Sequence, residues 1–133
     1  MKKIMLILSF FCVLNVFSQN LIGKTKEQVL QHWKQKVSDE NITEYPADED
    51  SQAGISVSFG IDDLMYFFNK ANICVEFVTK TKSDNLSILI ANLNANKKLK
   101  LNKNGEWIDA VKKFKWTIKD LDNQRIELKC IKY

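Results

Sequence analysis

The chain has 133 residues, of which 20 are basic and 16 acidic, and it contains a single histidine and a single proline. Hydrophobic residues make up 45% of it, enough for one domain with its own core. All the basic residues except Arg125 are lysine, so the bidentate phosphate or carboxylate recognition that favours arginine has little support.

Residues 1–18 have the pattern of a cleaved export signal. Lys2 and Lys3 form a positive start, Ile4–Phe17 is an almost unbroken apolar run, and Ser18 supplies a small residue at the cleavage point. The run is short for a membrane span and no stop-transfer segment follows it. We therefore expect no transmembrane segment in the mature chain.

Cleavage near Ser18 predicts a periplasmic or secreted protein with a single domain over residues 20–133. Its 18 basic and 16 acidic residues give a net charge of +2, too small to favour nucleic acid as a partner.

Cys12 leaves with the signal, while Cys74 and Cys130 remain. These two can form one disulfide if their Cα atoms come within about 7 Å. The alternative is two buried thiols in separate strands.

A first amphipathic helix is expected after Thr25. Thr25 and Gln28 have the spacing of a capping box. An apolar stripe at helical spacing follows, and the helix is expected to end near Ser38. The stripe consists of Val29, Leu30, Trp33 and Val37.

Alternating apolar residues then predict strands joined by short turns, and an acidic loop at Glu44–Ser51 follows the first of them. The expected strands of this first group are a short edge strand at Ile42–Tyr45, then Ile55–Phe59, Leu64–Phe68 and Ile73–Thr79.

A second helix is expected after Ser83 or Asp84, ending at Asn94 or Asn96 in a left-handed residue. Its stripe is Leu86, Leu89, Ile90 and Leu93. Further strands are predicted at Leu99–Leu101, Trp107–Ile108, Phe114–Ile118 and Ile126–Cys130.

Runs of antiparallel strands predict the α+β class: one antiparallel sheet of about five to six strands with two helices on one face, in the order α-β-meander-α-β-meander. Two units of a helix plus strands hint at an internal duplication.

The helix entry Ile22–Val29 and the hairpin from Tyr66 to Cys74 resemble small exported proteins of Gram-negative bacteria. The helix-then-meander order is similar to that of the β-lactamase-inhibitor-protein and outer-membrane-assembly lipoprotein group, in which a G-x-[ST]-x-x-[EQ]-V stretch opens a helix as Gly23–Val29 does. The chain departs from that group in lacking a lipoprotein cysteine and in having single helices. The resemblance implies a protein-binding module.

The sequence offers few candidate residues for catalysis or metal binding. We therefore expect no cofactor, no metal and no enzymatic activity. His32 is the only histidine, so no Cys-His or Ser-His arrangement is indicated. Asp48–Asp50 could ligate Ca²⁺ but lacks EF-hand spacing, and a solvated loop is the simpler interpretation. Asp62 and Asp63 suit a turn as well as a carboxylate pair.

Two surfaces are candidates for binding. In Leu64–Phe68 both faces are apolar, so Met65 and Phe67, backed by Tyr66, can form a partner-binding spot or can be covered core residues. Lysines alternating with apolar residues could bind an anionic lipid or polysaccharide surface, or could protect the sheet from aggregation. These lysines are Lys98, Lys100, Lys113 and Lys115.

The favoured hypothesis is thus a non-enzymatic exported module that binds a protein partner or a second copy of itself. The alternative is a binder of anionic surfaces. A small enzyme is the third hypothesis, disfavoured by the single histidine and the absence of a nucleophile motif.

Overall fold

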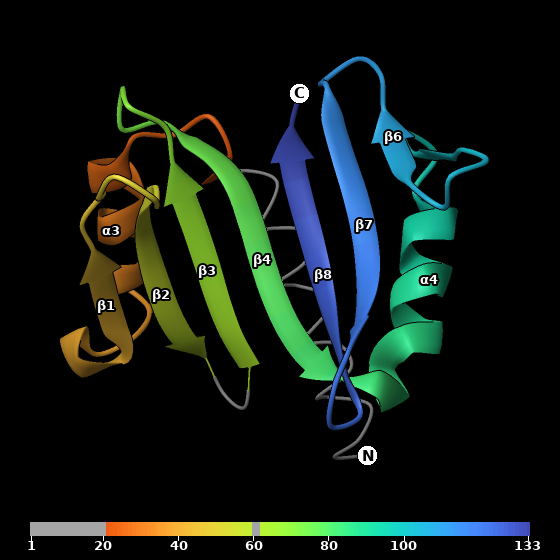
Figure 1. The fold of residues 1–133 in the computed structure, drawn as a ribbon, viewed down its shortest axis with the longest axis horizontal. Coiled ribbons are helices and arrows are strands. Elements are labelled where there is room, and N and C mark those ends of the chain that lie inside the picture. The colour runs from red at the N-terminus through yellow and green to blue at the C-terminus, as the bar shows by residue number, and fades with distance from the viewer. Residues whose placement is uncertain (1–20, 60–61) are drawn as a thin grey trace.

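An eight-stranded antiparallel sheet organises the part of the chain that the computed structural model describes, residues 21–59 and 62–133 (Figure 1). The predicted export signal lies outside these residues. The elements are α3 (Lys26–Lys34), a 3₁₀ turn (Asp39–Asn41), β1 (Ile42–Tyr45), β2 (Ala53–Phe59), β3 (Asp62–Phe68), β4 (Cys74–Lys82), a second 3₁₀ turn (Ser83–Asn85), α4 (Leu86–Ala95), β5 (Lys100–Leu101), β6 (Trp107–Asp109), β7 (Phe114–Leu121) and β8 (Arg125–Lys132).

The α+β class and the antiparallel sheet are confirmed, but the predicted five to six strands are too few, because the described residues form eight. Each of the eight strands overlaps a segment predicted from the sequence, and the total of five to six falls short because it does not count every short edge segment, where β1 has four residues, β5 two and β6 three. Such short segments carry too little alternation to be counted with confidence from sequence.

The first helix begins as predicted. Thr25 is its N-cap, its hydroxyl accepts from the Gln28 backbone N–H at 3.2 Å, and the Gln28 side chain accepts from the Thr25 N–H at 2.9 Å. Val29 and Trp33 are buried. The helix ends at Lys34 rather than near Ser38.

The second helix has the predicted stripe but different ends. Leu89 and Leu93 are buried. The Asn85 cap makes no capping hydrogen bond, and its side chain instead donates to the Thr81 hydroxyl at 2.8 Å. Asn96 ends the helix in an extended conformation, not in the predicted left-handed one.

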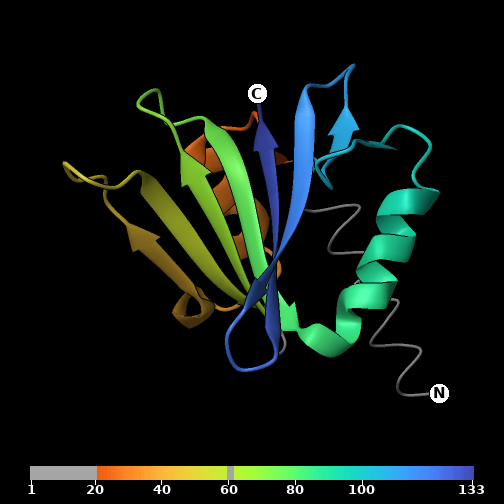
Figure 2. The same cartoon turned by 45° about the vertical axis from the view of Figure 1, so that its right-hand side comes forward.

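The strands lie in the order β1-β2-β3-β4-β8-β7-β6-β5 (Figures 1 and 2). The two meanders therefore meet at the centre of the sheet, where β4 pairs antiparallel with β8. Each meander follows one helix, so the described chain has the order α-β4-α-β4. This arrangement agrees with two related units joined at β4 and β8.

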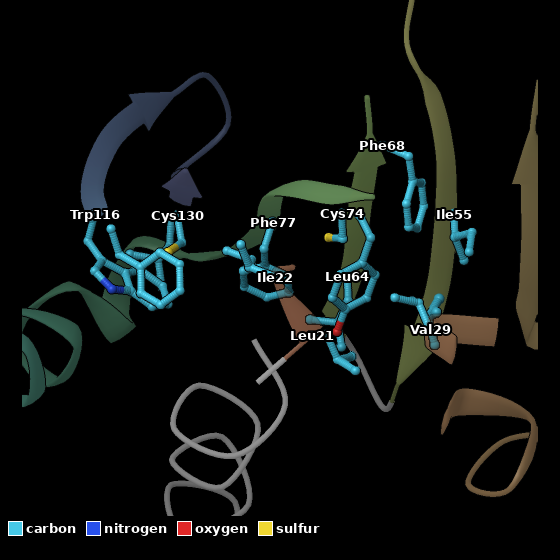
Figure 3. Packing of buried hydrophobic residues seen from close by; sticks show 14 of the residues in the cluster. Leu21, Ile22, Val29, Ile55, Leu64, Phe68, Cys74, Phe77, Trp116 and Cys130 are labelled. Atoms are coloured by element: carbon cyan, nitrogen blue, oxygen red, sulfur yellow. The ribbon is translucent and has the colours of Figure 1, made fainter. Parts of the chain in front are cut away.

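One hydrophobic core joins both helices to the same face of the sheet, because buried residues of α3, α4 and six of the strands share one cluster. Leu21 and Ile22 lie against Leu64 and Phe77 in this cluster (Figure 3). The opposite face has no described helix on it. We call it the open face.

Candidate partner-binding face

Strand β3 presents Met65 and Phe67 on the open face. Leu64, Tyr66 and Phe68 point into the core and are at most 1% exposed, whereas the alternate residues Met65 and Phe67 are half-buried. Met65 and Phe67 thus lie on the face away from the helices and outside the main core. Tyr66 contributes to the core instead of the open face, with its ring 5.2 Å from that of Phe77.

The strand register places one residue from every strand in a single line across the open face. We call this line the mixed row, because it combines apolar and charged side chains. In order from β1 to β5 it consists of Tyr45, Gly54, Phe67, Glu76, Ile131, Lys115, Ile108 and Lys100.

The mixed row has an aromatic surface around Gly54, because this residue has no side chain to separate its aromatic neighbours. A Cβ built on Gly54 would lie 3.5 Å from Cδ1 of Phe67, so the Phe67 ring lies over the glycine backbone. On the other side of Gly54, Tyr45 is 47% exposed. Two aromatic side chains therefore flank a residue that has no side chain of its own.

Val78 is buried on the open face, although it does not belong to the core. It is 5% exposed, and its register partners are Met65 and Lys129. The Lys129 ammonium lies 3.3 Å from the Glu76 carboxylate, and Glu76 precedes Val78 by two residues on the same strand. This ion pair holds the lysine stem next to Val78, as long cationic side chains do over apolar surface.

A second line crosses the four central strands two rows from the mixed row. We call it the charged row. Its members, from β3 to β7, are Asp63, Lys80, Glu127 and Lys119. The signs alternate along it, and the Ser58 hydroxyl donates to Asp63 at 3.3 Å at its β2 end.

The structure brings together only two of the four lysines proposed for anionic surfaces. Lys100 and Lys115 share the mixed row, and Lys115 lies 3.3 Å from the Glu106 carboxylate. Lys98 precedes β5, and Lys113 precedes β7 with a left-handed backbone and its ammonium over the Tyr133 ring. The mixed row, the charged row and Lys129 together place five lysines and three acidic residues on the open face.

A shallow polar hollow lies where β3, β4 and β8 approach the β7–β8 turn. It is lined by Asp62, Asp63, Thr81, Lys82, Asp84, Asn123, Gln124 and Arg125. Burial raises the pKa of Asp62, partly offset by a hydrogen bond from Thr81 and the charge of Arg125. Asp62 and Asp63 begin β3 and do not form the predicted turn. Lys82 and Arg125 line the same hollow as these carboxylates. The hollow therefore carries both signs of charge and does not favour a ligand of either sign.

Cys74 and Cys130, the cysteines of the described residues, are free and buried and form no disulfide. Cys74 lies opposite Phe68, and Cys130 lies between Phe77 and Trp116. Burial raises the pKa of the Cys74 thiol to about 12 and also raises that of Cys130. Protonated thiols are poor nucleophiles, so neither residue is prepared for catalysis.

The other candidates for chemistry are separate from one another. Burial and the charge of Lys36 lower the pKa of His32. The Asp48 carboxylate accepts from the backbone N–H groups of Asp50 and Ser51 at 2.8 and 2.7 Å, as in a self-contained loop. In the described residues, no group of three or more His, Cys, Asp or Glu side chains could hold a metal ion.

The sequence identifies Met65 and Phe67 as candidate partner-binding residues, but it does not indicate the rows of side chains to which they belong. Ile131 and Ile108 each alternate with core residues along their strands, and this alternation can be read from the sequence. The pairing of β4 with β8 sets their alignment with Phe67, and no local pattern contains that pairing.

Across residues 21–59 and 62–133, no helix is long and apolar enough to cross a membrane.

Comparisons of the chain with models of protein families, with curated proteins and with solved structures find no match.

Proposed function

We propose that the protein is a non-enzymatic, exported interaction module that binds a protein partner through the open face. The observation that carries the proposal is the mixed row, in which Phe67 lies over Gly54 with Tyr45 exposed beside it. Aromatic side chains are enriched at the centres of protein interfaces. The resemblance to the β-lactamase-inhibitor-protein group supports the same role.

The composition of the open face also suits a protein partner. Met65 and Phe67 supply apolar contact area, while Glu76 and Lys129 form an ion pair beside them. Apolar centres with charged surroundings are typical of interfaces between proteins that also exist free in solution. Surfaces of that composition stay soluble before the partner arrives.

An anionic lipid or polysaccharide is a weaker candidate. Binding sites of that kind are clusters of lysine and arginine, whereas Asp63, Glu76 and Glu127 lie among the lysines of the open face. Binding to anionic vesicles that decreases with salt would favour this alternative over a protein partner.

The proposal is tested with Met65→Ser/Phe67→Ser in residues 20–133. We expect the variant to stay folded by circular dichroism and to lose the partner that the wild-type domain retains in the native host. Val111→Ser is the matched control, because Val111 is 92% exposed outside the sheet. An unfolded variant would assign the pair to the core, and unchanged partner recovery would contradict a binding role.

A further inference from the structure

The polar hollow at the ends of β3, β4 and β8 is framed by hydrogen bonds between its walls. It has a volume of about 550 Å³, within the range of about 300–1,000 Å³ that is usual for small-molecule sites. The Gln124 carbonyl accepts from the Ser83 N–H at 2.9 Å, which joins the β7–β8 turn to the segment after β4. The guanidinium of Arg125, the only arginine of the chain, donates to the Lys80 carbonyl at 3.4 Å.

One wall of the polar hollow carries a carboxylate that is anchored by a buried hydroxyl. Asp62 and Asp63 are consecutive at the start of β3. Thr81, which is 2% exposed, donates to the Asp62 carboxylate, and its hydroxyl accepts from the Asn85 side chain at 2.8 Å. A hydroxyl has one proton to donate, so the hydrogen bond from Asn85 directs that proton towards Asp62. The Asp62 carboxylate is therefore held in one position.

The other wall carries two neighbouring cations. Lys82 and Arg125 are register partners on β4 and β8, and like charges directly opposite each other in a sheet are destabilising. Among the described residues, no ion pair joins an acidic residue of the hollow to either cation. The acidic pair Asp62 and Asp63 and the basic pair thus line one hollow without neutralising each other directly.

A molecule that carries both signs of charge fits these walls better than a simple ion does. A small anion attracted to Arg125 would be repelled by Asp62, and a small cation attracted to Asp62 would be repelled by Arg125. An ammonium group can donate to the Asp62 carboxylate, while a carboxylate on the same molecule can accept from the planar Arg125 fork. The amides of Asn123 and Gln124 line the same hollow and can bind further polar groups.

We infer that the polar hollow binds a small zwitterion of the α-amino acid type, with its ammonium at Asp62 and its carboxylate at Arg125 and Lys82. A free amino acid and a short peptide both carry these two groups. The hollow lies at the start of β3, whereas Met65 and Phe67 lie further along this strand. The inference therefore concerns a second site, separate from the proposed partner-binding surface, and the two can be tested independently.

NMR titration of isotope-labelled residues 20–133 tests the inference. The zwitterionic probes are L-alanine, L-glutamine and L-alanyl-L-alanine, while N-acetyl-L-alanine and L-alaninamide each lack one of the two charges. We expect a zwitterion to shift the backbone resonances of Lys82, Asp84 and Gln124 saturably at millimolar concentration. It should bind about tenfold or more tightly than either single-charge probe, because each charged group adds a charge-assisted hydrogen bond. Saturation by L-alanine or L-glutamine assigns a free amino acid, and saturation by the dipeptide alone assigns a peptide.

Two substitutions then assign the charged groups. Asp62→Asn should weaken the zwitterion by about tenfold but leave N-acetyl-L-alanine unaffected, and Arg125→Gln should weaken the zwitterion similarly but leave L-alaninamide unaffected. Asp122→Asn and Lys103→Gln are the matched controls, since both residues are exposed and do not line the hollow, and they should change nothing.

Circular dichroism checks that each variant is folded, and Lys82→Gln replaces Arg125→Gln if the latter is not. The inference is overturned if no zwitterion shifts the resonances of the hollow, or if a single-charge probe binds the wild type as tightly as the zwitterions do. Wild-type affinity for the zwitterion in both substituted proteins would overturn it as well.

Discussion

The cysteines show how position in the sheet controls side-chain chemistry. Cys74 and Cys130 lie on adjacent strands, β4 and β8, but at different levels of the ladder, because Phe77 and not Cys74 is the register partner of Cys130. Each thiol is fully buried. The sequence did not decide between a disulfide and two buried thiols. In the structure both residues are buried thiols.

We expect both thiols of residues 20–133 to react slowly with a thiol reagent in the native state and at once in denaturant. A thiol pKa of about 12 for Cys74 in the folded chain lies above its unfolded value of about 8.5. Stability from these buried thiols is therefore complete below the unfolded pKa and is lost as the pH rises toward 12. Absence of thiols in denaturant would reveal a disulfide, and rapid native labelling would contradict the burial.

Asp62 gives a second prediction at this scale. Its folded pKa is raised by burial, so wild-type stability falls as the pH rises from the unfolded pKa through the folded value. Asp62→Asn does not titrate, and its stability relative to wild type should therefore increase from acidic to neutral pH in urea unfolding. Asp122→Asn, in an exposed turn, should show no such increase. A constant difference between Asp62→Asn and wild type would contradict the assigned environment.

Among the elements, the helices could be predicted more fully than the strands. A capping box and a periodic stripe are local, and both lie within α3 and its cap. The edge strands are too short to show a pattern of their own and are defined by their pairing: β5 is a strand because Lys100 and Leu101 pair with β6. The β3–β4 bulge beside Phe68 has no local signature either.

The second helix should stabilise the fold through one residue in particular. Leu89 is 0% exposed, so Leu89→Ala should lower the free energy of unfolding by about 2–5 kcal/mol. Ile90 is only partly buried against the same core, and Ile90→Ala should have a smaller effect. Denaturant unfolding of the two variants measures both, and equal effects would contradict the assigned face of α4.

At the scale of the whole molecule, the sheet has one face that the described helices pack against and one that they leave open. The alternation in the sequence separates Met65 and Phe67 from Leu64, Tyr66 and Phe68, but it leaves open whether Met65 and Phe67 are covered. It did not predict the alignment of Phe67 with Ile131 and Ile108, because this depends on the pairing of the two meanders at β4 and β8. The candidate site is therefore a product of topology, assembled from strands that no short motif connects.

We propose the open face as the binding surface of the protein. Photo-crosslinking in the native host tests it most directly, with the photoreactive residue at Phe67 or at Leu101. Leu101 is 54% exposed and is the register partner of the core residue Trp107, so it lies on the helix side of the sheet. We predict an adduct of one defined mass from position 67 and none of that mass from position 101. No adduct from position 67, or the same adduct from both positions, would contradict the account.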